Sequence, residues 1–333
     1  MSRSLLEIQD LTVDFHTPEG VGRAVDHVSF SLEKGETLGL VGESGCGKSI
    51  TSLSILGLVP SPPGEITGRV LFEGRDLLKT HREEIRAVRG QDISMIFQEP
   101  MTSLNPVLTI GRQVAEPLVV HKHMSMEEAR KEALQWLEHV KIPAAARRLD
   151  DYPHQLSGGM RQRVMIAMAM VCRPKLLIAD EPTTALDVTI QSQILSLMLK
   201  LKEELGMSVL LITHDLGVVA QMARRVVVMY AGQVVEEASV TDLFDNPLHP
   251  YTQGLLRSIP GAGGKPAVGK KRLNEIPGTV PPITESIRGC TFAPRCARSF
   301  GACREKTPHL LTVGSGHRVR CRLFEKTSGG ELK

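Results

Sequence analysis

The chain has 333 residues, of which 41% are hydrophobic and 23% are charged. It is too long for one small domain and apolar enough for a globular core, so we expect one large domain with an additional segment. The formal net charge is +3, and Lys and Arg are interleaved with Asp and Glu. The charge therefore gives no argument for a nucleic-acid partner, which is not expected, and it leaves the class of partner open.

The N-terminal residues lack the pattern of a secretion signal. Leu5 and Leu6 are followed at once by Glu7, which leaves no apolar stretch of signal-peptide length. The longest apolar runs, at residues 209–212 and 226–230, are as long as strands, whereas a bilayer span needs about 20 residues. If the protein serves a membrane, we expect it to do so as a peripheral subunit.

Apolar runs of strand length alternate with segments of helical period up to about residue 235. This alternation predicts an α/β fold with a largely parallel sheet. The strands that the pattern indicates most clearly are Thr37–Val41, 94–97, 175–179 and Ser208–Thr213. Further along the chain, the pair Ala231 and Gly232 predicts a hairpin that closes the core.

A helical subdomain is predicted between the second and third of these strands, at about residues 100–160. Ser125 and Glu128 have the spacing of a capping box, which marks the start of a helix. Leu134 and Leu137 then lie on one side of that helix, where an apolar stripe would pack against its neighbours.

A glycine-rich loop directly follows the first predicted strand, and its pattern between strand and helix is that of a phosphate loop. The loop consists of Gly42, Glu43, Ser44, Gly45, Cys46, Gly47, Lys48 and Ser49. Backbone N–H groups of such a loop converge on a polyphosphate at the positive end of the following helix. We expect Lys48 to reach the β- and γ-phosphates of ATP and Ser49 to ligate Mg²⁺. Cys46 occupies a variable position and is not expected to act as a nucleophile.

Two adjacent carboxylates, Asp180 and Glu181, follow the strand predicted at residues 175–179. Successive side chains at the end of a strand point in different directions, so the two can serve different functions. We expect Asp180 to hold Mg²⁺, through water, and Glu181 to act as general base on the water that attacks the γ-phosphate. For the pair alone, the alternative is an acidic turn after a strand.

The segment at residues 156–163 indicates a family. Ser157 is a good N-cap, Gly158 and Gly159 follow it, and an apolar helix continues to residue 171. The segment resembles the signature of ATP-binding-cassette (ABC) ATPases, in which it covers the ATP held by the partner subunit. The resemblance implies a RecA-like phosphate-loop core, an antiparallel β subdomain, and two cassettes that bind two nucleotides between them head to tail.

Further positions match the family in the same order along the chain. Gln98 resembles the glutamine that contacts Mg²⁺ and water and senses the membrane partner through the helical subdomain. His214 resembles the switch histidine on the γ-phosphate, and Asp187 belongs to a loop through which the two cassettes communicate. Phe15 resembles the aromatic residue that stacks on adenine, with a place in the core as the alternative.

The chain changes character after residue 245, where Pro and Gly become frequent. We therefore expect an ABC nucleotide-binding domain at residues 1–245 and a loop-rich extension at residues 246–333. Residues 246–252 and 289–296 resemble the C-terminal extension of the dipeptide, oligopeptide and nickel importer branch.

The resemblance to this importer branch implies substrate and partners. ATP hydrolysis would power the import of short peptides, or of nickel as the alternative within the branch. The implied partners are a second ABC ATPase subunit (an identical or a related chain), two transmembrane permease subunits and an external peptide-binding protein. The subunit would lie at the cytoplasmic face of the cell membrane.

Four of the six cysteines, Cys290, Cys296, Cys303 and Cys321, lie in the extension. In a reducing cytoplasm such a group indicates metal or cluster ligands before disulfides. Four thiolates complete either a zinc site or a [4Fe–4S] cluster. Their long, irregular spacing and the resemblance to the importer branch favour the iron–sulfur cluster, with zinc and unligated or disulfide-bonded cysteines as alternatives.

Two other functions come from different classes of protein. A soluble cassette ATPase that acts on DNA or ribosomes tends to carry a long coiled coil or two cassettes in one chain, and this sequence has neither. A non-catalytic, metal-binding regulatory subunit would be expected to lose some of the site residues. Lys48, Gln98, Asp180, Glu181 and His214 are all present, which argues against it.

Overall fold

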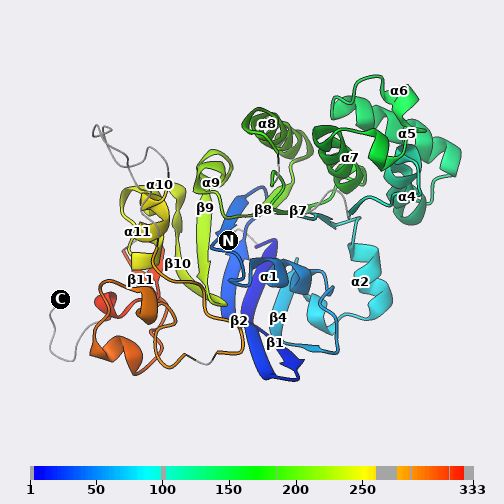
Figure 1. Ribbon diagram of the computed structural model, residues 1–333. Coiled ribbons are helices and arrows are strands. Elements are labelled where there is room, and N and C mark those ends of the chain that lie inside the picture. The colour runs from blue at the N-terminus through cyan, green and yellow to red at the C-terminus, as the bar shows by residue number, and fades with distance from the viewer. Residues whose placement is uncertain are drawn as a thin grey trace, which may run out of the picture. The chain divides into compact units, whose positions relative to one another are not determined.

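The computed structural model describes residues 4–98, 103–184, 186–259, 276–285, 287–314 and 316–325. The chain divides into two compact units (Figure 1). The helical unit comprises Leu32–Thr37 and Lys79–Ile212. The sheet unit comprises Ser4–Ser31, Leu38–Leu78 and the chain from Thr213 onward.

Three parallel strands form the sheet of the helical unit. β7 (Leu176–Asp180) lies between β6 (Ile93–Ile96) and β8 (Ser208–Thr213). Every residue of β7 and β8 is buried, as expected for parallel strands covered on both faces. Because parallel strands end at the same edge of a sheet, residues that follow β6 and β7 come close together there.

The helices of this unit include four that lie between β6 and β7 in the chain, which confirms the predicted helical insertion. The described helices of the unit are α2 (Arg82–Val88), α4 (Ile110–Lys122), α5 (Met126–His139), α6 (Ala145–Arg148), α7 (Gly158–Met170) and α8 (Val188–Leu205), and the four between the two strands are α4, α5, α6 and α7. Helices α4, α5 and α7 pack on one another (Figure 1). The predicted capping box is present at the start of α5, where Ser125 Oγ accepts from the Glu128 N–H at 3.3 Å.

The sheet unit contains two sheets. The first is antiparallel, with the strand order β2-β1-β4-β5. Its strands are β1 (Leu6–Thr17), β2 (Gly20–Leu32), β4 (Gly64–Phe72) and β5 (Arg75–Asp76). In the second, β3 is parallel to β9, and β10, β12 and β11 continue antiparallel. These strands are β3 (Thr37–Val41), β9 (Arg225–Tyr230), β10 (Gln233–Ser239), β11 (Leu311–Val313) and β12 (His317–Val319).

Short helices complete the sheet unit, and several 3-10 turns occur along the chain. The helices are α1 (Lys48–Ile55), α9 (Leu216–Met222), α10 (Val240–Asp245) and α11 (Pro250–Arg257). The 3-10 turns are Leu77–Lys79, Pro153–Gln155, Ala293–Arg295, Gly301–Arg304 and Arg322–Phe324. Among the described residues, no helix is long and apolar enough to cross a membrane.

The predicted strands and hairpin agree with the structure. The strands predicted at Thr37–Val41 and Ser208–Thr213 are confirmed to the residue, whereas β6 starts one residue earlier and β7 one residue later than predicted. Ala231 (φ 42°) and Gly232 (φ 77°) form the tight turn between β9 and β10. Two successive left-handed residues suit the twist of a two-residue hairpin loop.

The extension packs into the same core as the strands before it. β12 pairs with β10, with Glu236 opposite Val319. Tyr251 and Phe292 lie in one buried cluster with Tyr230 of β9. The described part of the extension therefore packs against the sheet, because its apolar side chains cover part of it. The domain boundary at residue 245 stays a prediction.

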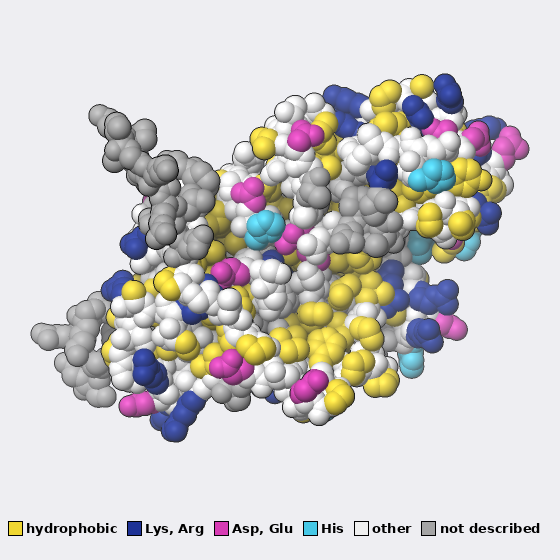
Figure 2. Space-filling view, in the orientation of Figure 1, with side chains coloured by type: hydrophobic (Ala, Val, Ile, Leu, Met, Phe, Trp, Pro, Cys, Tyr) yellow, Lys and Arg dark blue, Asp and Glu magenta, His cyan; other side chains and the backbone are white. Residues whose placement is uncertain are grey.

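Charged side chains of both signs are visible on the face of the molecule that Figure 2 presents. Figure 2 shows Lys and Arg side chains scattered among Asp and Glu over the face that it presents, without a continuous basic patch among the described residues of that face.

Candidate nucleotide site

The phosphate loop lies between β3 and α1 in the sheet unit. Close backbone approach explains two of its glycines. A Cβ atom at Gly42 would lie 2.3 Å from the carbonyl oxygen of Met229, and one at Gly47 would lie 2.4 Å from that of Ala24. Gly47 also has a φ of 99°, a conformation that residues with a Cβ rarely adopt. Any side chain at either position would push the loop away from the strands beneath it.

Lys48 folds back across this loop. Its ammonium group donates to the carbonyl oxygens of Gly42, at 2.8 Å, and Glu43, at 2.9 Å, and the side chain is almost fully buried. The cation thus lies at the centre of the loop, where a polyphosphate would be bound. Burial raises the pKa of the Cys46 thiol, and a neutral thiol is a poor nucleophile.

Gln98 and Glu181 come together in the helical unit, because β6 and β7 end at the same edge of the sheet. Glu181 Oε2 accepts hydrogen bonds from Gln98 Nε2 at 3.1 Å and from Thr184 Oγ1 at 2.8 Å. Asp180, the preceding residue, is buried at the end of β7. Glu181 has a φ of 47°, and a left-handed residue of this kind carries backbone strain that is common at functional sites.

The sequence analysis missed two residues that hold Glu181 and the turn after it. Thr184 follows it by three residues and binds it directly. Gln162, on α7, is buried and donates to the carbonyl oxygen of Pro182 at 2.6 Å. Gln162 lies within the signature segment, so its position was visible in the sequence, but its contact with the turn after Glu181 depends on packing.

Ser157 and Asp187 lie at one cavity of about 550 Å³ in the helical unit. Ser157 caps α7, where its Oγ accepts from the Met160 N–H at 3.4 Å. Asp187 caps α8, where its Oδ1 accepts from the Ile190 N–H at 2.9 Å. Two helix N-termini therefore face the same space, and helix N-termini attract anions.

The wall of this cavity adds glycines and cations to the two caps. Gly158 and Gly159 line it together with Lys141 and Arg163. A Cβ atom at Gly158 would meet no other atom within 4 Å, whereas one at Gly159 would lie 3.0 Å from Ile190. The backbone at Gly158 is therefore open to the cavity, whereas Gly159 allows α7 to pack closely against Ile190 of α8.

Phe15 and His214 lie in the sheet unit with the phosphate loop. Phe15 is half-buried near the end of β1, opposite Gly64 of β4, and its ring packs beside that glycine. His214 is exposed and follows directly after β8. Gln98, Asp180, Glu181, Ser157 and Asp187 belong to the helical unit instead.

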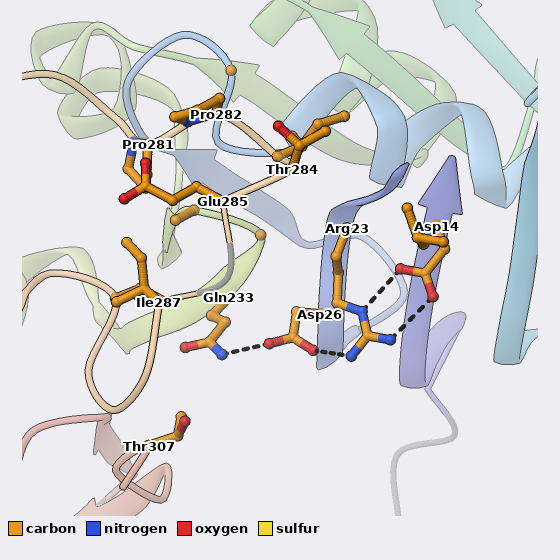
Figure 3. Close-up of a pocket in the computed structure, with 16 residues that line it drawn as sticks. Asp14, Arg23, Asp26, Gln233, Pro281, Pro282, Thr284, Glu285, Ile287 and Thr307 are labelled. Carbon is orange, nitrogen blue, oxygen red and sulfur yellow. Dashed lines mark hydrogen bonds and ion pairs between the residues drawn. The ribbon is translucent and has the colours of Figure 1, made fainter. Parts of the chain in front are cut away.

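A second cavity, of about 430 Å³, lies in the sheet unit next to β1 (Figure 3). Asp14 and Gly45 line it, together with residues 281–285 of the extension. Arg23 joins both carboxylate oxygens of Asp14, at 2.9 and 3.0 Å, and this hydrogen bonding holds the pKa of Asp14 below its usual range. Because neighbouring residues of a strand face opposite sides, Phe15 points away from this cavity.

The four late cysteines line one small cavity of the sheet unit, beside Phe292. All are free thiols. Burial raises the pKa of Cys290 and of Cys296, and it raises that of Cys321 to about 11. Within the described residues, no three His, Cys, Asp or Glu side chains are grouped closely enough to hold a metal ion. The thiols fit a four-thiolate site in kind and number, and ligation would require them to move closer together.

Comparisons with known proteins agree with this geometry. The family model described as ABC transporter matches residues 25–184, and the one described as Oligopeptide/dipeptide transporter, C-terminal region matches residues 235–303. The chain is 54% identical, over 95% of its length and 94% of that protein, to a probable peptide ABC transporter ATP-binding protein, y4tR, of Sinorhizobium fredii. It is 55% identical, over 97% of its length and 98% of that protein, to the oligopeptide transport ATP-binding protein AppD of Bacillus subtilis.

Solved structures show the same fold. The ATP-binding cassette MJ0796, described as a dimer in a post-hydrolysis state bound to ADP and Pi, matches 71% of this chain and 98% of its own, with a TM-score of 0.63 and 31% identity. CbiO1 of Clostridium perfringens, part of the cbiONQ transporter complex, matches 73% of this chain and 92% of its own, with a TM-score of 0.61 and 28% identity. The predicted α/β fold, of RecA-like phosphate-loop type, is thereby confirmed.

Proposed function

Because the chain belongs to the family of ATP-binding proteins of peptide ABC transporters, we propose that it hydrolyses ATP to drive the import of peptides. The observation that carries this proposal is that the likeness to peptide transport proteins extends over nearly the whole chain, including the C-terminal region. The names of these relatives do not favour nickel as the substrate. A soluble ATPase acting on nucleic acid finds no support among them.

The test is reconstitution. The chain is purified together with its transmembrane permease subunits and placed in proteoliposomes with the external peptide-binding protein. ATP hydrolysis should rise when short peptides are added, and labelled peptide should accumulate inside. Stimulation by Ni²⁺ and not by peptides would contradict the proposal.

In the proposed mechanism, ATP binds at the phosphate loop with Mg²⁺. Lys48 would hold the β- and γ-phosphates, Ser49 and, through water, Asp180 would hold the metal, and Gln98 would contact metal and water. Glu181 accepts the proton from the attacking water, and His214 contacts the γ-phosphate. Support comes from the loop geometry around Lys48 and from the direct Gln98–Glu181 hydrogen bond.

We infer further that two cassettes close head to tail around ATP. The Ser157 and Asp187 caps share a cavity with basic side chains, which suits the phosphate of a nucleotide held by another subunit. The dimeric cassette MJ0796 offers a parallel. ATP-driven closure would move the transmembrane permease subunits, and hydrolysis would reopen the pair. The subunit would then lie at the cytoplasmic face of the membrane.

Phe15 provides a prediction about the adenine. If its ring stacks on the base, Phe15→Leu should weaken ATP binding by about 5-fold to 150-fold, since base–aromatic stacking contributes about 1–3 kcal/mol. The melting temperature should change little, because leucine preserves apolar volume. Phe15→Tyr should bind like the wild type. Equal affinities for all three proteins, measured by isothermal titration calorimetry, would assign Phe15 to the core.

We also propose that Cys290, Cys296, Cys303 and Cys321 hold a [4Fe–4S] cluster, with Zn²⁺ as the alternative. Support comes from four free thiols at one cavity and from the resemblance of residues 246–252 and 289–296 to the extension of the importer branch. The cluster would link four parts of the extension to one another, because each of the four cysteines would bind it.

The metal content tests this proposal. Anaerobically purified wild-type protein should be brown and contain about four iron atoms per chain. Cys296→Ser should lose most of the iron and melt at a lower temperature. Cys172→Ser is the matched control, because this free buried thiol lies elsewhere, and it should keep the iron. One zinc per chain would select the alternative, and metal-free wild-type protein would contradict both.

A further inference from the structure

The extension holds the phosphate loop through a single arginine. Arg295 ends the 3-10 turn Ala293–Arg295, and its side chain is only 5% exposed. Its terminal nitrogens bind both carboxylate oxygens of Glu43, with Nη1–Oε2 at 2.6 Å and Nη2–Oε1 at 3.1 Å. A bidentate pair of this kind fixes orientation as well as distance. Arg295 therefore determines where the second residue of the phosphate loop lies.

Arg295 is itself firmly positioned. Its Nε donates to the carbonyl oxygen of Pro277 at 2.8 Å, and Nη2 also donates to that of Ile276 at 3.2 Å. The guanidinium carbon lies 5.7 Å from the centre of the Tyr230 ring. An exposed ion pair between mobile side chains contributes little, but this pair joins a buried, many-partnered guanidinium to the loop.

A second residue of the extension holds the main chain of the same glutamate. The hydroxyl of Tyr251, on α11, accepts a hydrogen bond from the Glu43 N–H at 2.8 Å. The Tyr251 ring is fully buried, with its centre 4.8 Å from that of Tyr230 and 5.4 Å from that of Phe292. Both the side chain and the backbone of Glu43 are thus held from the extension.

Glu43 connects these two residues to the nucleotide machinery. Its carbonyl oxygen accepts the 2.9 Å hydrogen bond from Lys48. A shift of Glu43 would therefore move a ligand of Lys48 and change the curvature of the loop. Small errors of position in such a loop are costly, because its donors act only at close range.

We propose that Arg295 and Tyr251 are positioning residues for ATP binding, and that through them the C-terminal extension sets the affinity of the phosphate loop for ATP. This inference rests on the proposed binding of ATP at that loop. If the two residues only tethered the extension to the core, their loss would lower the stability of the protein and leave its affinity for ATP unchanged.

The test compares Arg295→Met and Tyr251→Phe with the wild type in the full chain. We expect Arg295→Met to raise the Kd of a fluorescent ATP analogue and the KM for ATP by at least about tenfold, because it leaves a charge unpaired. The change in kcat should stay within about threefold, since Glu181 is untouched. Tyr251→Phe loses one neutral hydrogen bond and should raise Kd by about 2-fold to 10-fold.

Arg225→Met is the matched control. Arg225 pairs with Glu237 at 3.0 Å in the same unit, joining β9 to β10 away from the phosphate loop. Its loss should lower the melting temperature without raising the KM for ATP. The double variant Glu43→Gln/Arg295→Met should bind ATP no more weakly than Arg295→Met alone, because the two side chains act as one unit.

Each outcome decides the inference. Kd and KM within twofold of the wild type in Arg295→Met would overturn it, as would an equal rise of KM in Arg225→Met. If Arg295→Met does not fold, Tyr251→Phe takes its place, and an unchanged Kd there is the contrary result. A wild-type chain that fails to bind the ATP analogue would instead overturn the proposed function, and this inference with it.

Discussion

Glu181→Gln is expected to lower kcat for ATP hydrolysis by a factor of about 10² to 10⁴ while ATP still binds, as for the loss of a general base. The amide cannot accept the proton of the attacking water, but it keeps the size and hydrogen-bonding capacity of the carboxylate. The left-handed backbone at this position and the hydrogen bonds from Gln98 and Thr184 fix the direction of the Glu181 side chain. Steady-state hydrolysis and equilibrium ATP binding, measured on the same preparation, separate the two effects.

Thr184→Val provides the control for Glu181. It removes the 2.8 Å hydrogen bond to the carboxylate but leaves the base itself, so kcat should fall by no more than about tenfold. A Glu181→Gln variant that turns over at a rate similar to the wild type would contradict the assignment of Glu181 as base.

Gly47→Ala is expected to abolish measurable ATP binding. The new methyl group would lie 2.4 Å from the carbonyl oxygen of Ala24, at a residue with φ of 99°. Strand β2 cannot yield there without disturbing its pairing, so the loop itself must move and its N–H groups no longer converge. Titration with a fluorescent ATP analogue gives the affinity, and circular dichroism shows whether the remaining fold persists.

Gly35→Ala is the matched variant for Gly47. Gly35 also has a positive φ, of 74°, but an added Cβ there would meet nothing within 4 Å. Gly35→Ala should lower the free energy of unfolding by about 1–2 kcal/mol, because of the left-handed backbone alone. Its affinity for ATP should stay unchanged. ATP binding by Gly47→Ala at wild-type affinity would refute the view that close backbone approach shapes the loop.

Local features of the sequence predicted much of the fold. The phosphate loop could be predicted because its glycines must occupy fixed positions within a few residues of one another. The capping box of α5 could be predicted because Ser125 and Glu128 are three residues apart. The hairpin at Ala231 and Gly232 was visible for the same reason. In each case the physical requirement acts between residues close together in the chain.

Contacts between distant parts of the chain could not be predicted in this way. Arg295 and Glu43 are 252 residues apart, and no spacing rule links them. The shared cavity of Ser157 and Asp187 depends on how α7 packs on α8. The Pro-rich and Gly-rich composition of the extension predicted loops, whereas β12 forms a strand there because it pairs with β10.

The most direct measurement is a structure of the Glu181→Gln transporter complex with ATP and Mg²⁺. We expect Ser157 Oγ and the Gly159 N–H to lie about 3 Å from the γ-phosphate of a nucleotide bound at the phosphate loop of the other cassette. ATP bound at a phosphate loop while Ser157 lies far from every nucleotide in the assembly would contradict the account.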